Sequence, residues 1–388
     1  MTSTGNDNGP LRPQSQLVTV FGGSGFLGRH VVRALAKRGY RVRVAVRRPD
    51  LALFLQPLGK VGQIVAVQAN LRYPESVRRA VEHSDIVINL VGILQEQGSQ
   101  RFASLQTEGA GTIARAAAAV GARMIHVSAI GADEASPSLY ARSKAAGEAE
   151  VRRASPDAVI FRPSLVFGPG DGFFNRFAGL ATFLPVLPLA GAQSRFQPVF
   201  VGDVAEAIAR AVDGDAKAGA VYELGGPEVN TLQYFVRYML EVIMRRRAVI
   251  DLPEPAARFQ ARVLEIVDTL TFGLLPPNLK LTRDQVTLLQ SDNVVSEAAK
   301  SEGRTIEGLG IVPTAVEAVV PGYLWPFRKA GQFAQGRGTE AMAAVPDLIA
   351  SSTEAPESQH RPARASGPAI GAEAAGASRM GRRWGTRS

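Results

Sequence analysis

The stretch LVTVFGGSGFLG, residues 17–28, decides how the rest of this chain is organised. It begins with apolar and β-branched residues, which predict a short buried strand. Gly22, Gly25 and Gly28 then follow at three-residue spacing, and residues 30–38 have the pattern of a helix. Glycines in such a turn let the backbone approach a pyrophosphate closely, and the N–H groups and dipole at the start of the helix attract its charge. The stretch therefore predicts a dinucleotide site, with an ordinary strand-to-helix turn as the alternative.

The composition excludes several classes of function. The chain has 388 residues and no cysteine, so disulfides, thiolate catalysis and cysteine-held metals are excluded. Its four histidines are scattered, and we therefore expect no metal site. Residues 1–16 lack the apolar core of a signal peptide, and no window holds about 18 uncharged apolar residues, so we expect no transmembrane segment. These features predict a soluble or peripheral protein that faces the cytoplasm.

The net charge of +9 lies partly at the end of the chain, where residues 361–388 carry six arginines and one acid. A basic segment of this kind predicts contact with an anionic membrane surface or an acidic subunit, and a solvated tail is the alternative. Nucleic acid is not expected, because no strand interleaves aromatic and basic residues.

Apolar strand patterns alternate with helical patterns along the first half of the chain. The expected strands are residues 18–21, 41–46, 64–67, 85–91, 124–127 and 158–161, and the expected helices are 30–38, 75–83, 102–120 and 138–153. This alternation predicts an α/β fold with a Rossmann-type, doubly wound parallel sheet.

Glycines, prolines and phenylalanines break the pattern from Gly168 onward, which predicts a second, smaller lobe of α/β type. In it we expect strands at 197–201 and 221–224, a helix capped by Asp203, a helix capped by Thr231 that ends in three arginines (245–247), a helix at 256–272 and an apolar tip at 274–277. The expected organisation is a disordered segment (1–16), an NAD(P)-binding domain (17–167), the lobe, which partly returns to the sheet (168–334), and a disordered basic tail (335–388).

Two pairs of residues indicate what the site binds. Arg47 and Arg48 follow the second expected strand, where an acid would bind the ribose 2′-hydroxyl of NAD and an arginine accommodates the 2′-phosphate of NADP. NADPH is therefore expected in preference to NADH. Tyr140 and Lys144 share one face of a helix, where the lysine would lower the pKa of the phenol and hold the nicotinamide ribose. Such a pair can move a proton to or from a carbonyl or alcohol.

The chain resembles the extended or atypical short-chain dehydrogenase/reductase family over residues 17–228. The segments that carry the resemblance are GGSGFLG (22–28), NLVG (89–92), HVS (126–128), YARSKAAGE (140–148), RPSLVFGPGD (162–171), PVFVGDVAEAI (198–208) and YELGGPE (222–228). The residue pattern and the resemblance together predict a set of cofactor-binding residues. They are Gly22, Gly23, Ser24, Gly25, Phe26, Leu27, Gly28, Arg47, Arg48, Asn70, Leu71, Val91, Gly92, Ser128, Tyr140, Lys144 and Pro163.

A narrower resemblance is to the bacterial form of the nucleotide-binding accessory subunits of respiratory complex I, the NADH:ubiquinone oxidoreductase. It rests on residues 21–49, 125–148 and 170–181, and above all on DQVTLLQSDNVVS (284–296), which lies outside the dehydrogenase core. The resemblance implies NADPH held structurally rather than turned over, partners among the other complex I subunits, and a peripheral position at the cytoplasmic face of the inner membrane.

Two departures from the dehydrogenase pattern bear on catalysis. Active members carry a run of Ser or Thr after the fifth strand, whereas Ser128 is followed by Ala129 and is expected to cap the strand. Asn70 replaces the aspartate that bonds adenine. The sequence therefore favours a subunit in which Tyr140 and Lys144 are vestigial as catalysts. The alternative is an NADPH-dependent reductase, epimerase or dehydratase that acts on a sugar nucleotide or a lipid-like substrate.

Overall fold

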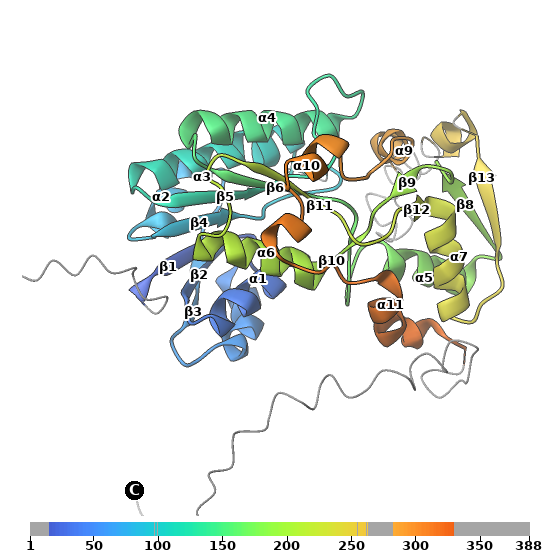
Figure 1. Cartoon of the computed structure of the whole chain (residues 1–388), viewed down its shortest axis with the longest axis horizontal. Coiled ribbons are helices and arrows are strands. Elements are labelled where there is room, and N and C mark those ends of the chain that lie inside the picture. The colour runs from blue at the N-terminus through green and yellow to red at the C-terminus, as the bar shows by residue number, and fades with distance from the viewer. Residues whose placement is uncertain are drawn as a thin grey trace, which may run out of the picture. The chain divides into compact units, whose positions relative to one another are not determined.

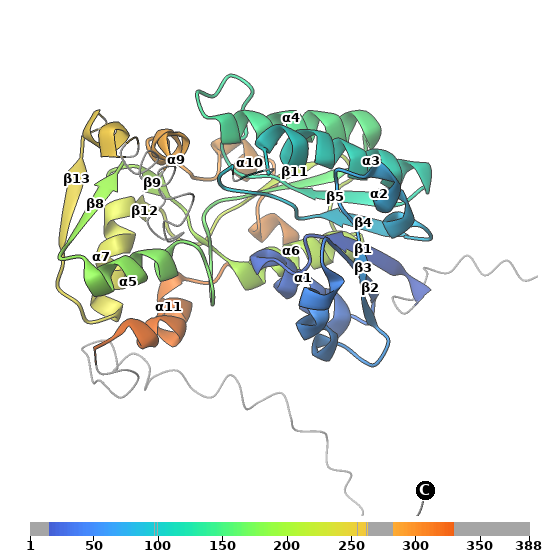
Figure 2. The same ribbon diagram turned by 180° about the vertical axis from the view of Figure 1, so that it is seen from behind.

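A computed structural model describes residues 15–329 except 97, 99, 254, 261 and 263–281. Figures 1 and 2 show it from two opposite sides. The ends expected to be disordered lie outside the described residues, apart from 15 and 16, and so does the apolar tip expected at 274–277. The helix expected at 256–272 is described only in part, as a helical stretch over 255–260.

A seven-stranded parallel sheet forms the first layer, as the alternating pattern predicts. Its strands, in spatial order, are β11 (Val221–Leu224), β6 (Val159–Pro163), β5 (Arg123–Val127), β4 (Ile86–Asn89), β1 (Leu17–Phe21), β2 (Arg41–Val46) and β3 (Ile64–Gln68). The order reverses between β1 and β4. In a doubly wound sheet, ligands bind outside the carboxyl ends of the strands at this reversal.

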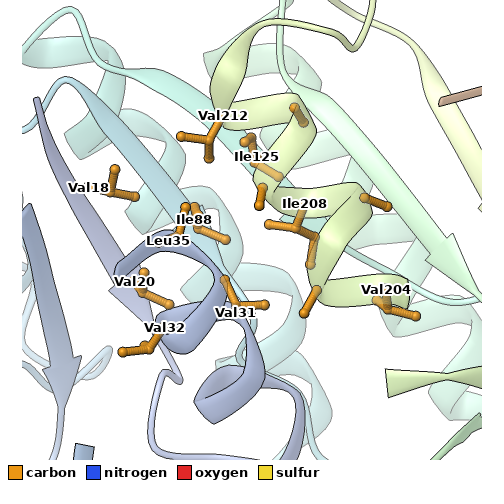
Figure 3. Packing of buried hydrophobic residues seen from close by; sticks show 14 of the residues in the cluster. Val18, Val20, Val31, Val32, Leu35, Ile88, Ile125, Val204, Ile208 and Val212 are labelled. Carbon is orange, nitrogen blue, oxygen red and sulfur yellow. The ribbon is translucent and has the colours of Figure 1, made fainter. Parts of the chain in front are cut away.

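Helices cover both faces of the sheet (Figures 1 and 2). One face carries α1 (Phe26–Lys37) and α6 (Val201–Asp213), and the other carries α2 (Pro74–Val81), α3 (Glu108–Ala119) and α4 (Leu139–Ala154). Between the sheet and the α1–α6 layer lies a core of fully buried aliphatic side chains (Figure 3). It includes Val20, Ile88, Val31, Leu35 and Ile208, and burying each such side chain stabilises the fold by roughly 1.5–3 kcal/mol.

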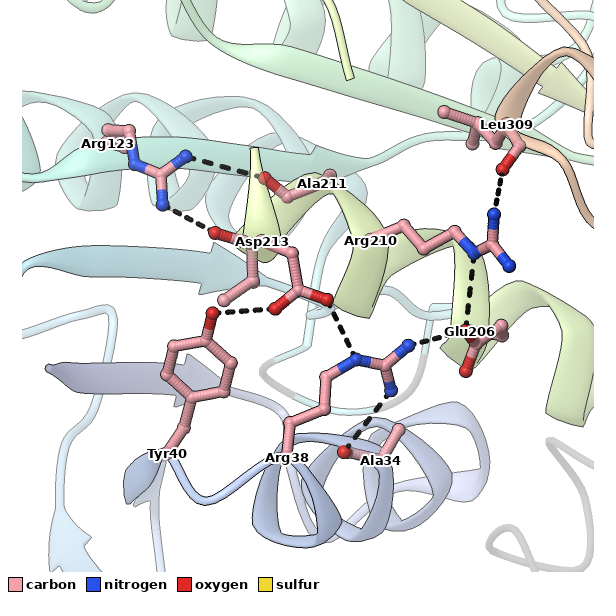
Figure 4. A network of polar contacts seen from close by, with 10 residues as sticks. Ala34, Arg38, Tyr40, Arg123, Glu206, Arg210, Ala211, Asp213 and Leu309 are labelled. Atoms are coloured by element: carbon pink, nitrogen blue, oxygen red, sulfur yellow. Dashed lines mark hydrogen bonds and ion pairs between the residues drawn. The ribbon is translucent and has the colours of Figure 1, made fainter. Parts of the chain in front are cut away.

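Polar contacts join α1 and α6 at their C-terminal ends (Figure 4). Arg38 Nε donates to Asp213 Oδ2 at 2.9 Å, and a second guanidinium nitrogen pairs with Glu206. Tyr40 Oη donates to the other oxygen of Asp213 at 2.7 Å. Arg123, from the end of β5 nearest these contacts, donates to the carbonyl of Val212 at 2.6 Å.

The lobe has its own hydrophobic core, to which the phenylalanine-rich stretch contributes. Its elements are α5 (Phe174–Phe183), α7 (Leu232–Val242), α11 (Val316–Leu324) and the short strand pairs β8 (Val186–Ala190) with β13 (Ala248–Leu252), β9 (Arg195–Phe196) with β12 (Asn230–Thr231), and β7 (Val166–Phe167) with β10 (Val199–Phe200). Phe167, Phe174 and Phe235 are fully buried, whereas Phe183 is exposed. Buried phenylalanines therefore form part of this core.

Several expected element boundaries are wrong. Helix α1 begins at Phe26 and not at residue 30, because Gly25 occupies its N-cap. The strand expected at 85–91 is limited to β4, and the one at 197–201 to β10. The helix expected at 102–120 begins with a π-helical turn, η3 (Ala103–Thr107), before α3.

Two expected charge–helix contacts are also wrong. Asp203 lies inside the first turn of α6 and does not cap it; its carboxylate accepts hydrogen bonds from the backbone N–H (2.6 Å) and hydroxyl (3.1 Å) of Thr314. The three arginines at 245–247 lie beyond the end of α7, after a turn in which Met244 has φ +56°. Arg245 and Arg247 consequently bond carbonyls of Phe327 and Ala181 instead of their own helix. Thr231 does cap α7, with its hydroxyl accepting from Tyr234 N at 3.2 Å.

Two further helices, α9 (Arg283–Leu289) and α10 (Glu297–Ser301), lie between β13 and α11 in sequence. Helix α9 packs Val286 against Ala190 and Ala257 on the lobe side and also contacts the start of α4 (Figure 1). The N-cap of α10, Ser296, donates its backbone N–H to Glu223 of β11 at 2.8 Å. Within the described ranges, no helix has the length and apolar character needed to cross a bilayer.

Candidate dinucleotide site

The glycine turn lies at the point where the strand order reverses. Gly22 leaves β1 with φ +78°, a conformation that glycine adopts at low cost. A Cβ atom at Gly22 would lie 3.1 Å from the carbonyl carbon of Leu90 and 3.2 Å from Val91 N. The turn therefore lies against the backbone that follows β4, and a side chain at Gly22 would crowd that backbone and strain the turn.

The start of α1 is open to an anion. Gly25 is its N-cap and offers no side chain to bond the N–H groups of the first turn, which also contains no acid. A Cβ atom at Gly28 would lie 2.2 Å from Gly22 O, so a glycine there is needed to pack α1 beneath the turn. Ser24 lies in the glycine turn, and Phe26 and Leu27 are the first two residues of α1. Open amides and a helix dipole without a neutralising acid fit a pyrophosphate.

The arginines at the end of β2 differ in their surroundings. Both side chains are exposed. Arg48 Nη2 is paired with Asp50 Oδ2 at 2.8 Å. Arg47 has no hydrogen bond or ion pair with any other residue in the described part of the chain. Of the two, Arg47 is the cation available for a 2′-phosphate.

Asn70 and Leu71 follow β3, two strands away from β1. The side-chain oxygen of Asn70 accepts from Arg72 N at 3.2 Å, which forms a local turn. Leu71 packs against the helix at Gly109, where a Cβ atom would lie 2.7 Å from Leu71 Cδ1. The Asn70 side chain thus lies at the carboxyl edge of the sheet, and its oxygen accepts the hydrogen bond that forms the local turn.

A buried hydrogen-bonded pair that we did not expect from the sequence holds the backbone after β4. Asn89 Oδ1 accepts from Val91 N at 3.0 Å, so the Asn89 amide nitrogen faces His126 Nδ1 at 3.1 Å. Because that amide donates, the imidazole proton lies on Nε2, which has no partner among the described residues. Burial lowers the pKa of His126 to about 3, and the nearby Lys144 charge acts in the same direction.

Tyr140 and Lys144 lie on α4, one helical turn apart. Lys144 Nζ lies 6.0 Å from the centre of the Tyr140 ring and donates to the carbonyl of Val127 at 3.2 Å. A Cβ atom at Gly92 would lie 3.3 Å from the same nitrogen. The pair and the backbone at Gly92 therefore form one side of the site.

The pKa of Tyr140 is not lowered as expected. Burial raises it to about 12, and burial lowers the pKa of Lys144 to about 8, against the attraction of Glu148 one turn away. The lysine charge is directed at a backbone carbonyl and does not offset the desolvation of the phenol. The pair is better suited to hydrogen bonding than to proton transfer near neutral pH.

Ser128 does not cap β5 with its hydroxyl. Its backbone N–H donates to Phe161 O at 2.7 Å, whereas its buried Oγ has no partner within the described residues. An unpaired buried hydroxyl at the carboxyl edge of a sheet fits a ligand with polar atoms. Pro163, also expected in the site, is buried at the end of the neighbouring strand β6, and its carbonyl accepts from Ile130 N at 3.0 Å.

Two further groups at the site were missed from the sequence. Glu148 is buried and paired by Arg162 through both carboxylate oxygens at 2.8 Å. Asp284, 145 residues beyond Leu139, accepts hydrogen bonds from the first turn of α4. The sequence around Asp284 is noticeable only through the resemblance, because no local pattern indicates which helix it contacts.

The residues present fit a dinucleotide. The glycine turn, the open end of α1, Arg47, the backbone at Gly92 and the free Ser128 hydroxyl lie along the carboxyl edge of the sheet. In the described part of the chain, no three His, Asp or Glu side chains are grouped so as to hold a metal ion.

Comparisons with known proteins show what the chain is similar to. The model of the NAD dependent epimerase/dehydratase family matches residues 18–225. The mitochondrial NADH dehydrogenase (ubiquinone) 1 alpha subcomplex subunit 9 of Arabidopsis thaliana is 34% identical over 321 residues, which cover 81% of this chain and 79% of that protein. The Rattus norvegicus protein of the same name is 36% identical over 304 residues, 78% of either chain.

A ceramide reductase of Caulobacter vibrioides is 40% identical over 189 residues, which cover 49% of this chain and 58% of that protein. Among solved structures, an NADPH-dependent quinone oxidoreductase from Escherichia coli, complexed with NADPH, superposes with a TM-score of 0.59 at 19% identity, covering 79% of this chain and 98% of that one. At that identity the likeness shows the fold alone.

Proposed function

The chain belongs to the NAD dependent epimerase/dehydratase family, and on that premise we propose that it is an accessory subunit of respiratory complex I that holds NADPH as a structural cofactor. The observation that carries the proposal is the likeness to named complex I subunits over about four-fifths of the chain. That likeness extends beyond residues 18–225, the part that the family model matches.

NADPH is favoured over NADH because of the cation at the end of β2. Arg47 is exposed and unpaired within the described ranges, and no acid occupies the position that would bond a ribose 2′-hydroxyl. The residues that would hold the nucleotide are the glycine turn at the pyrophosphate, Arg47 at the 2′-phosphate, and Lys144 with Tyr140 at the nicotinamide ribose.

Retention of the cofactor without turnover is supported by the state of the polar groups around it. The pKa of Tyr140 is raised to about 12, so the phenol keeps its proton and can donate a hydrogen bond but gives up that proton poorly. Ser128 is followed by Ala129, Ile130 and Gly131, so no second hydroxyl comes directly after it to help hold a substrate oxygen.

The proposal places the protein at the periphery of the cytoplasmic face of the inner membrane, among the other subunits of the complex. The arginine-rich segment at 361–388 would add contact with an anionic membrane surface.

The experiment that tests the proposal uses the native protein. Membranes of the source cell are solubilised gently, the large complexes are separated, and the chain is located by immunoblot. We expect it to migrate with NADH:quinone oxidoreductase activity and to release one NADPH per chain only on denaturation. A free protein whose nucleotide exchanges readily and is oxidised by added carbonyl compounds would contradict the proposal.

The second candidate is an NADPH-dependent reductase with a lipid-like substrate. It is favoured by the 40% identity to a ceramide reductase, which covers 49% of this chain. In that case bound NADPH would supply a hydride, and Tyr140 would supply the proton. Tyr140→Phe distinguishes the two, because an enzyme loses its turnover whereas a structural subunit keeps its cofactor and its place in the complex.

A further inference from the structure

The N-terminal end of α4 is capped by a carboxylate from a distant part of the chain. Asp284 Oδ1 accepts from Leu139 N at 2.6 Å, and Asp284 Oδ2 accepts from Tyr140 N at 3.2 Å and from Ser138 Oγ at 3.0 Å. Ser138 Oγ in turn accepts from Ala141 N at 3.3 Å. Ser138 and Asp284 thus satisfy the first three N–H groups of α4, which a helix cannot pair internally.

The capped turn carries a residue of the proposed cofactor site. Tyr140 is the second residue of α4, and its own N–H is one of the groups that Asp284 bonds. Lys144 follows one turn later. Since an uncapped first turn frays readily, the position of the Tyr140 ring depends on a carboxylate 144 residues away in sequence.

The segment that supplies Asp284 also contacts the loops after three neighbouring strands. Residues 283–296 make these contacts, and we call them the 283–296 segment. Gln285 donates to Leu94 O after β4 at 3.4 Å, and Asn293 Nδ2 donates to Ile130 O after β5 at 3.4 Å.

The third contact is the shortest. Ser164 Oγ, after β6, donates to Asn293 Oδ1 at 2.6 Å. The carboxyl ends of β4, β5 and β6 border the half of the site that contains Gly92, Ser128 and Lys144. One segment therefore connects the loops that follow these three strands.

From this arrangement we propose that Asp284 is a positioning residue for Tyr140, through which the 283–296 segment slows the release of the bound dinucleotide. The inference rests on the proposed function, because it assumes that NADPH binds. Ordering α4 and its neighbouring loops favours binding, and binding must favour the capped state by the same factor. The segment thus gives a physical reason for a cofactor that is held and not exchanged.

The test compares Asp284→Ala with the full-length wild type and with a matched control. The control is Asp203→Asn, which weakens another acid-to-backbone contact between distant segments, the one to Thr314, on the face of the sheet opposite α4. Each protein is loaded with NADPH and mixed with excess NADP⁺, and the loss of nicotinamide fluorescence gives the release rate. Hydrogen exchange at residues 139–141 reports the cap separately.

We expect NADPH to dissociate from Asp284→Ala about tenfold faster than from the wild type, whereas its association rate should change far less. A tenfold change corresponds to about 1.4 kcal/mol, which is typical of the loss of a helix cap. Asp284→Asn keeps one acceptor for Leu139 N, so its rate of NADPH release should lie between those of the wild type and Asp284→Ala. Asp203→Asn should release NADPH at the wild-type rate.

Either of two results would overturn the inference alone. The first is an unchanged rate of NADPH release from Asp284→Ala although the amide hydrogens of residues 139–141 exchange faster. The second is an equally faster release of NADPH from Asp203→Asn, when the two variants lose the same amount of melting temperature. A wild type that binds no NADPH at all would contradict both the inference and the proposed function.

Discussion

Lys144 keeps a buried charge that the protein without its cofactor holds at a cost. Its side chain is almost fully buried and donates to the Val127 carbonyl, with the Glu148 charge farther away. Burial lowers its pKa from 10.5 to about 8. In the unfolded chain the same ammonium is hydrated. Groups held in this way are typical of binding sites, where a ligand supplies the missing interaction.

Replacing Lys144 should stabilise the protein without cofactor near neutral pH. Because the folded pKa lies below the unfolded one, the wild type gains stability as pH rises from about 8 to 10.5, and below about 8 it has none of that gain. We expect Lys144→Met to raise the free energy of unfolding by about 1–3 kcal/mol at about pH 7, and by much less at about pH 10. Denaturant titrations at the two pH values measure this, and parallel pH profiles would exclude the effect.

The two arginines after β2 should differ in what they recognise. Arg47→Ala should weaken NADPH binding by about tenfold and leave NADH binding unchanged, because the variant loses one charge-assisted contact to the 2′-phosphate. Arg48→Ala is the matched control and should have less effect, since Arg48 is already paired with Asp50. Fluorescence titrations with both nucleotides decide the matter. Equal losses for NADH and NADPH would show that neither arginine contacts the phosphate.

At the scale of elements, α1 and α6 are far apart in sequence and adjacent in space. Both pack aliphatic side chains onto the same face of the sheet, and Asp213 joins their ends by accepting from Arg38 and Tyr40. Since α1 begins at the glycine turn, the contact also fixes the helix whose N-terminus would face the proposed cofactor.

Asp213→Asn should lower the free energy of unfolding by about 1–2 kcal/mol, because it weakens two hydrogen bonds to a partly buried carboxylate. Asp50→Asn serves as the control. It removes an exposed ion pair with Arg48, and we expect a change within about 0.5 kcal/mol. Denaturant unfolding of both variants tests the difference. Equal losses of unfolding free energy would show that the α1–α6 contact stabilises the fold no more than an exposed ion pair does.

At the scale of the whole molecule, the sequence concentrates positive charge at one end. Removing residues 337–388 should therefore reduce binding to vesicles that contain phosphatidylserine, since each arginine near such a surface contributes about 1 kcal/mol. Neutral vesicles are the control and should bind neither form. Co-sedimentation at low and high salt measures the effect. If the shortened chain binds anionic vesicles as well as the full chain does, the arginine-rich segment plays no part.

The parallel sheet could be predicted because each of its strands is marked locally. The apolar runs at β1, β4 and β6 are short and bounded by turn residues, and the helices between them end at glycines such as Gly39. Boundaries were less certain where local signals compete. The π-helical turn at η3 and the early start of α1 both depend on neighbouring backbone, which an apolar pattern does not encode.

The candidate site was predictable only in part, for a similar reason. The glycines and the Tyr140–Lys144 spacing are local patterns and were recognised. The Asn89–His126 pair joins two strands, and the pKa of Tyr140 depends on how deeply the ring is covered. Burial is a property of the packed molecule, so the expected direction of that pKa was wrong.

The sequence by itself determined the α/β alternation and the glycine turn, because strand and helix periods and the conformational freedom of glycine act over a few residues. Only the tertiary structure decided that Asp284 caps α4, that Arg47 is unpaired while Arg48 is not, and that Lys144 is directed at a carbonyl. These depend on side chains that meet across the fold, in one case 145 residues apart, and no local pattern specifies which of many polar side chains will meet.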